Sequence, residues 1–131
     1  MDRKIYQKLL VWKEKNSKMP YMLVGARQTG KTYILTNFCK NEFKNYLYLN
    51  LDSMPEIKEI FETTIEPERI IKSIEAILSI NIDIENTIIF IDEIQVSEKA
   101  ICSLKYFCES ESNYKIVVAG SLLGVKINRF K

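Results

Sequence analysis

The residues best suited to chemistry lie in one glycine-framed loop, Gly25-Ala26-Arg27-Gln28-Thr29-Gly30-Lys31-Thr32. This loop fits the Walker A pattern G-x-x-x-x-G-K-[ST] at every fixed position. Glycines let the chain turn tightly and bring its backbone N–H groups close to phosphate oxygens. We therefore expect the eight residues to cradle a triphosphate, with Lys31 at the β- and γ-phosphates and the Thr32 hydroxyl as a Mg²⁺ ligand. Arg27 either faces the phosphates or points to solvent.

Two carboxylates, Asp92 and Glu93, follow the apolar run at 88–91. Ligands of open parallel sheets bind beyond the carboxyl ends of the strands, so this pair should converge with the glycine loop. We expect Asp92 to hold Mg²⁺, directly or through its waters, and Glu93 to polarise the water that attacks the γ-phosphate. Alone such a pair is a weak signal, but it lies about sixty residues after the loop, with the right topology between.

A third polar group, Ser121, ends the apolar run 117–119 in the same way. Its hydroxyl is expected to bond the γ-phosphate or the attacking water, which would make Ser121 part of the catalytic set; the alternative is a serine that caps the next turn. Gln95 is a weaker candidate for orienting polar groups near the site.

The elements that must position these groups alternate along the chain. Apolar spacing and β-branched runs predict helices over 4–15 and 31–40, two helical pieces within 53–80 and a helix from a Ser97 cap to about 109, with strands at 21–24, 45–51, 87–91 and 114–119. Long crossovers without tight hairpin signals favour a parallel sheet covered by helices on both faces. The sequence therefore predicts an α/β fold.

Composition excludes several other classes of protein. The chain has 131 residues, 47% hydrophobic and 27% charged, as expected for one globular domain with a real core. It has no histidine, and its three cysteines form no C-x-x-C pair, so a zinc site is not expected and buried reduced thiols are. We found neither an apolar run of about 20 residues nor a signal-peptide core, which predicts a cytoplasmic protein without a membrane segment.

Charge is unevenly distributed, although the net charge is only +2. Residues 1–50 carry ten Lys and Arg against three Asp and Glu, and residues 51–131 carry nine against fourteen. A basic half is compatible with a nucleic-acid partner. The favoured interpretation is a solvated N-terminal helix, because six of the cations lie between Arg3 and Lys18.

Three segments together resemble a known family: the loop at 25–32, Phe-Ile-Asp-Glu-Ile-Gln at 90–95, and Ala-Gly-Ser-Leu-Leu-Gly at 119–124. They look like the prokaryotic AAA-type ATPases in which an N-terminal ATPase domain usually precedes a C-terminal domain of unknown function. The resemblance spans residues 20–124. It implies a three-layer α/β/α P-loop NTPase of the branch with an additional strand and a catalytic glutamate. The implied sheet order is 2-3-4-1, with a fifth strand beside the first.

The chain departs from this family after the fourth predicted strand, because it stops at Asn128-Arg129-Phe130-Lys131. The fifth strand, the helical lid, any arginine finger and the C-terminal domain are therefore expected to be missing. We expect a single truncated domain over 1–131, with an N-terminal helix and lead-in at 1–19 and a P-loop core at 20–124. An exposed sheet edge beside the first strand would favour self-association.

The leading hypothesis is Mg²⁺-dependent ATP binding and hydrolysis that drives a conformational change in an unknown partner. The alternative is an ATP-dependent switch with little turnover, with or without DNA engagement. A phosphotransferase is less favoured, because only Arg69 and Arg129 follow the loop as candidate phosphate clamps. No Asn-Lys-x-Asp segment is present, which favours adenine over guanine.

Overall fold

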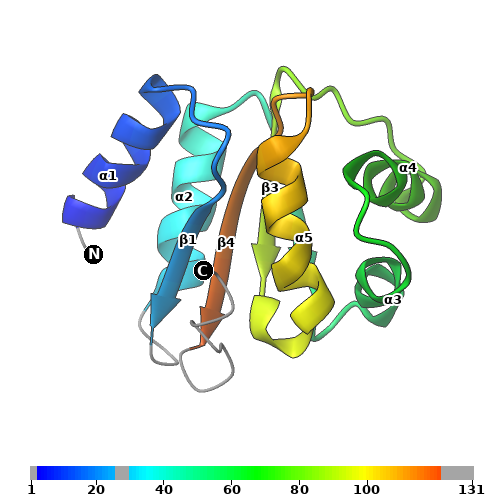
Figure 1. Cartoon of the computed structure of the whole chain (residues 1–131). Helices are drawn as coiled ribbons and strands as arrows, with labels where there is room; N and C mark the ends of the chain where they lie inside the picture. Colours follow the sequence, from blue (N-terminus) through cyan, green and yellow to red (C-terminus); the bar gives the residue numbers. More distant parts are fainter. Residues whose placement is uncertain (1–2, 26–29, 122–131) are drawn as a thin grey trace.

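The computed structural model describes residues 3–25 and 30–121. Helices and strands alternate along this part of the chain (Figure 1), as the sequence predicts. The elements are α1 (Arg3–Glu14), β1 (Tyr21–Gly25), α2 (Lys31–Glu42), β2 (Asn45–Asn50), α3 (Pro55–Thr63), α4 (Pro67–Leu78), β3 (Thr87–Asp92), the 3₁₀ turn η1 (Ile94–Val96), α5 (Glu98–Glu109) and β4 (Lys115–Ser121).

The strands form one sheet in the order β1-β4-β3-β2, and all neighbouring pairs are parallel. This is the order 2-3-4-1 that the family resemblance implied, and it is confirmed. The described residues contribute four strands to the sheet. The expectation about a fifth strand concerns residues 122–131, which lie outside the described residues.

Helices cover both faces of the sheet, which gives three layers (Figure 1). Side chains alternate along a strand, so β3 serves two separate cores. Ile88 and Phe90 pack with α1 and α2, while Ile89 and Ile91 pack with α3, α4 and α5. All six residues of β3 are buried, as a strand covered on both faces requires.

The helix ends follow local sequence rules. Pro55 and Pro67 lie in the first turns of α3 and α4, where a missing backbone N–H costs little. The Ser97 side chain accepts a hydrogen bond from the Ala100 N–H at 3.1 Å, so the predicted cap of α5 is confirmed. This cap fixes where α5 begins after the η1 turn that follows the carboxylate pair.

The cysteines are free, but the expectation that all three are buried is wrong. Cys39 is buried, Cys108 is half-buried and Cys102 is exposed. The reason is the orientation of α5, which turns Ala100, Ile101 and Leu104 toward the core and leaves Cys102 on its outer side. In the described part of the chain, no helix is long and apolar enough to cross a bilayer.

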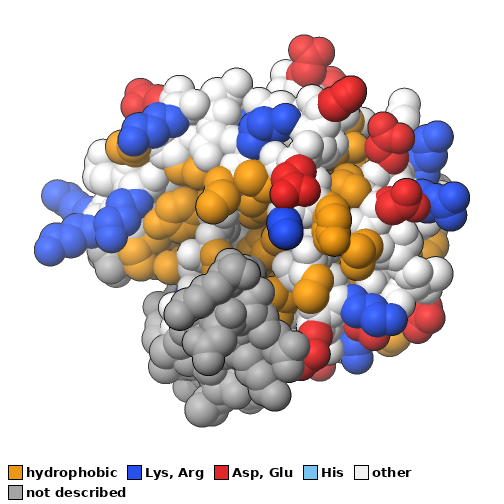
Figure 2. Space-filling view, in the orientation of Figure 1, with side chains coloured by type: hydrophobic (Ala, Val, Ile, Leu, Met, Phe, Trp, Pro, Cys, Tyr) orange, Lys and Arg blue, Asp and Glu red, His pale blue; other side chains and the backbone are white. Residues whose placement is uncertain are grey.

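The strand β1 contains no fully buried residue. All five of its residues are half-buried, and β4 is its strand neighbour within the described residues. Figure 2 shows apolar side chains at the surface on this face of the molecule, near β1 and α5. The edge that the sequence analysis associated with self-association is therefore partly accessible.

Candidate nucleotide-binding site

The polar residues that end three strands lie on the same face of the sheet. Side chains alternate along a strand, so Asn50, Asp92 and Ser121 share a face with the residues two positions earlier. Those earlier residues, Tyr48, Phe90 and Ala119, pack in the core formed with α1 and α2. The register places Asn50 beside Asp92, and Gly25 beside Ser121. The strand ends therefore converge on the helix that follows the glycine loop.

The glycine loop connects β1 to α2. Gly25 ends β1, and Gly30 precedes α2 with φ 80° and ψ 15°, a left-handed conformation that favours glycine. A Cβ at Gly30 would meet no atom within 4 Å, so the backbone conformation, and not space, calls for glycine there. The Lys31 ammonium donates to the Gly25 carbonyl at 3.4 Å, across the mouth of the loop. Ala26, Arg27, Gln28 and Thr29 lie outside the described residues.

Asp92 is a buried carboxylate with hydrogen-bond donors on both oxygens. Its exposed fraction is 4%, and a carboxylate at that depth needs compensating donors. Oδ2 accepts from the Thr32 hydroxyl at 2.9 Å and from the Tyr48 hydroxyl at 2.7 Å, while Oδ1 accepts from the Glu93 N–H at 2.9 Å. The fold thus brings together the two residues that the sequence analysis proposed as metal ligands.

Sequence reasoning missed two residues of this cluster, Tyr48 and Asn50. The Asn50 amide donates to the Tyr48 hydroxyl at 3.0 Å, and its carbonyl accepts from the N–H groups of Asp52 and Ser53 at 2.9 and 3.0 Å. Burial, and then the hydrogen bond to Asp92, raises the pKa of Tyr48 to about 12, so the phenol keeps its proton as a donor. Asn50 ends a strand, as Asp92 and Ser121 do, and the same rule applied to β2 would have found it.

Glu93 is held differently from its neighbour Asp92. Its backbone is left-handed, with φ 55° and ψ 44°, and its side chain is half-buried. The Gln95 amide nitrogen donates to Glu93 Oε1 at 2.6 Å, and the Gln95 carbonyl oxygen accepts from the Ser121 N–H at 3.1 Å. A carboxylate only accepts and a backbone N–H only donates, so an amide serves both at once. Gln95 therefore links Glu93 to the end of β4.

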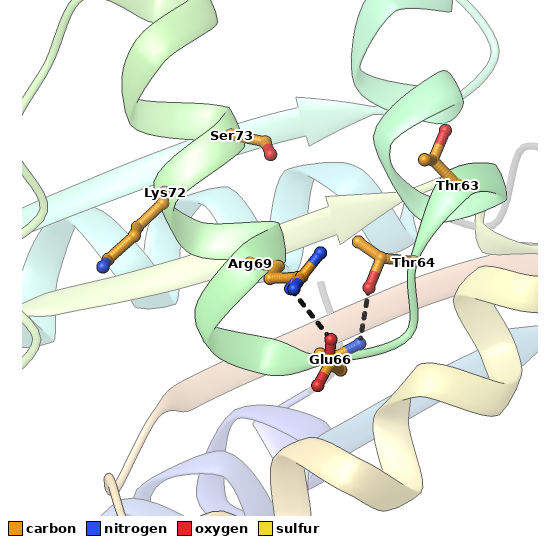
Figure 3. Close-up of a pocket in the computed structure, with 6 residues that line it drawn as sticks. All are labelled: Thr63, Thr64, Glu66, Arg69, Lys72 and Ser73. Carbon is orange, nitrogen blue, oxygen red and sulfur yellow. Dashed lines mark hydrogen bonds and ion pairs between the residues drawn. The ribbon is translucent and has the colours of Figure 1, made fainter.

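A separate open pocket lies at the junction of α3 and α4 (Figure 3). The Arg69 guanidinium pairs there with Glu66 at 3.0 Å, and the Glu66 N–H donates to Thr64 at 3.1 Å. None of the predicted site residues lines this pocket. No recorded contact among the described residues joins Arg69 to the polar residues at the strand ends. The residues that line the pocket are Thr63, Thr64, Glu66, Arg69, Lys72 and Ser73.

The strand-end cluster, which consists of Thr32, Tyr48, Asn50 and Asp92, contains the kinds of oxygen ligand that a phosphate-bound magnesium ion uses. Mg²⁺ in such sites takes one or two protein oxygens and completes its shell with phosphate and water. Thr32 and Asp92 supply a hydroxyl and a carboxylate oxygen in direct contact. The described residues contain no group of three or more acidic, cysteine or histidine side chains that would form an all-protein metal cage. The residues present therefore fit a shared metal–phosphate site.

The fold has three layers, α/β/α, around a parallel sheet of order 2-3-4-1, and a glycine loop connects β1 to α2. This is the fold of a P-loop NTPase. Residues 17–129 match a family model described as an AAA domain. The match covers most of the chain, so the protein belongs to the AAA domain family, and a nucleotide-binding function of the ATPase type follows. A search of curated proteins found no match.

Proposed function

We propose that the chain binds ATP with Mg²⁺ and hydrolyses it at the strand-end cluster. The observation that carries the proposal is the 2.9 Å hydrogen bond between Thr32 and Asp92, which unites the glycine loop with the acidic strand end. Lys31 and the backbone of residues 25–30 would hold the phosphates, and Thr32 and Asp92 would hold the metal. When bound, the metal would neutralise charge on the β- and γ-phosphates.

Glu93 is the proposed general base for the attacking water. It is half-buried and fixed by Gln95, whereas Asp92 is already committed to three donors. Only Glu93 of the pair thus keeps one carboxylate oxygen, Oε2, without a recorded hydrogen bond among the described residues. Ser121, at the end of β4, would bond the γ-phosphate or the water beside it.

Adenine is the proposed base, because the sequence has no Asn-Lys-x-Asp segment. The runner-up function is a switch that binds ATP with little turnover, which a Glu93→Gln variant distinguishes from hydrolysis. Three further points stay predictions: location in the cytoplasm, self-association through β1, and DNA binding by the N-terminal half. A DNA contact would weaken steeply as salt is raised.

The first test is thermal unfolding of the protein alone and with Mg·ATP, Mg·ADP or Mg·GTP. A ligand at a hundred times its dissociation constant stabilises the folded state by about 2.7 kcal/mol. We expect Mg·ATP to raise Tm by several degrees, and Lys31→Ala to abolish the rise. Lys40→Ala, an exposed lysine on the same helix, is the matched control and should keep it. An equal rise in wild type and Lys31→Ala would contradict the proposed phosphate site.

A further inference from the structure

We propose that Tyr48 is a positioning residue for the metal end of the site, acting through Asp92 on Thr32. The inference rests on the proposed function, because it concerns the same magnesium site. It adds a residue of β2 to a site so far built from the glycine loop and the ends of β3 and β4. The observation behind it is that Tyr48 and Thr32 donate to the same oxygen, Asp92 Oδ2, at 2.7 and 2.9 Å.

The chemistry of Tyr48, Thr32 and Asp92 determines which group donates in each hydrogen bond. An ionised carboxylate can only accept hydrogen bonds, so the Thr32 and Tyr48 hydroxyls must each donate their single proton to Asp92. The oxygen of each hydroxyl then has only lone pairs left to offer. The Tyr48 oxygen accepts from the Asn50 amide at 3.0 Å, whereas the lone pairs of Thr32 remain suited to a cation. Asp92 therefore turns Thr32 into a metal ligand, and Tyr48 fixes the carboxylate that does so.

Tyr48 is itself anchored on two sides. Its ring and that of Phe90 make a T-shaped contact with 5.1 Å between ring centroids, and the two residues are partners in the β2–β3 register. Its hydroxyl is oriented by Asn50, and the Asn50 carbonyl is held by two N–H groups of the turn after β2. A relay of hydrogen bonds thus runs from this turn through Asn50 and Tyr48 to Asp92.

Removing the Tyr48 hydroxyl would leave Thr32 as the only side-chain donor on Oδ2 among the described residues. The carboxylate would then lose one of the bonds that set its plane, and the Thr32 lone pairs would no longer be aimed in one direction. Loss of such an outer partner typically weakens metal binding by 10–100-fold. We expect the concentration of Mg²⁺ at half-saturation to rise roughly tenfold.

The test is Tyr48→Phe, which keeps the ring and removes one oxygen. Binding of a fluorescent ATP analogue is titrated against Mg²⁺ and repeated in EDTA, and Tm is measured alongside. Tyr46→Phe is the matched control, because Tyr46 lies on the same face of β2 and its hydroxyl makes no recorded hydrogen bond to the described residues. Tyr48→Phe should shift the Mg²⁺ titration and leave binding in EDTA unchanged, and Tyr46→Phe should shift neither.

The possible outcomes separate this inference from the proposed function. Binding that depends on Mg²⁺ in wild type, with a midpoint in Tyr48→Phe within twofold of wild type, would overturn the role of Tyr48 alone. An equal loss of binding with and without Mg²⁺ would also overturn it, because it would indicate a general effect on the fold. Absence of nucleotide binding in wild type at every Mg²⁺ concentration would overturn the proposed function and this inference together.

Discussion

The carboxyl ends of β3 and β1 lie on the same side of the sheet, but the two strands are packed very differently. All six residues of β3 are buried between two helical layers, and β3 has a strand on each side. All five residues of β1 are half-buried. β3 ends in Asp92 and is followed directly by Glu93, and β1 ends in Gly25, the first residue of the glycine loop. The proposed metal ligand Asp92 therefore stands on a fully buried strand, and the proposed phosphate loop follows a strand that is only half-buried.

The same contrast separates the neighbours Asp92 and Glu93. Asp92 belongs to β3 and is held by three donors, including one from β2 and one from α2. Glu93 has already left the strand, with a left-handed backbone and one side-chain contact to Gln95. Three hydrogen bonds hold the carboxylate that is proposed to bind the metal, while the proposed base keeps one oxygen, Oε2, without a recorded hydrogen bond among the described residues. This difference in burial and hydrogen bonding is the basis for proposing different roles for the two adjacent carboxylates.

The largest effect is expected from Glu93→Gln, which keeps the size of the side chain and removes the carboxylate proposed as the base. We expect kcat for ATP hydrolysis to fall by about a thousandfold, within the range for a lost general base. The rise of Tm with Mg·ATP should persist, because Asp92 and the loop are untouched. Steady-state phosphate release measures the first effect, and Glu85→Gln, an exposed residue before β3, serves as control. Unchanged slow turnover in Glu93→Gln would favour the binding-switch alternative.

Packing itself is tested by two aliphatic truncations, one on each strand. Ile89→Ala on β3 should lower the free energy of unfolding by about 3 kcal/mol, because Ile89 is 3% exposed in a closed core. Leu23→Ala on β1 removes a side chain of equal volume that is only half-buried, and should cost about 1 kcal/mol. Urea unfolding of both variants gives the ratio. Equal losses would mean that β1 is covered as completely as β3.

Gln95 links the end of β3 to the end of β4, so its removal should loosen Glu93. Gln95→Met keeps the length and deletes both hydrogen bonds, and we expect about a tenfold fall in kcat with KM unchanged. Gln95→Glu keeps an acceptor for the Ser121 N–H but sets a second carboxylate beside Glu93, and should also change the pH profile of kcat. A fall in KM and kcat together would instead point to a role in substrate binding.

The smallest expected effect is a change in the stability of the fold at alkaline pH. The pKa of Tyr48 lies at about 12 in the folded protein, above its ordinary value of 10.0. The unfolded chain therefore loses this proton first, and the stability due to Tyr48 is lost as pH rises from about 10 to about 12. Tyr48→Phe should lose less stability than wild type over this window, as measured by urea unfolding. The pKa of buried Cys39 is also raised, but it contributes equally to both proteins.

Much of the fold could be predicted from the sequence, because its local signals agree. The strands are apolar and β-branched, Pro67 and Ser97 mark helix starts, and the long crossovers predict parallel pairing. Boundaries shifted by one or two residues, as in β4, which runs to Ser121. The burial of Cys102 was mispredicted because one position on a helix decides between core and solvent.

The site was only partly predictable, for a physical reason. Asp92 and Thr32 are recognisable because their types and spacing carry chemistry. Asn50 could have been found as a polar strand end, but Tyr48 is an ordinary strand residue until the register sets it beside Phe90. Nor does any local signal foretell the left-handed backbone of Glu93, since residues other than glycine rarely adopt it. Tertiary pairing, absent from a single segment, determines both features.

The shared face of Asn50, Asp92 and Ser121 limits how the gene for this protein can change. One codon inserted inside β2, β3 or β4 would shift the pleat by half a period and turn the terminal side chain toward the opposite helical layer. Two codons would restore the face but displace the residue along the strand. Length variation among relatives should therefore fall in the connections, such as 79–86 between α4 and β3, while each of these strands keeps its number of residues.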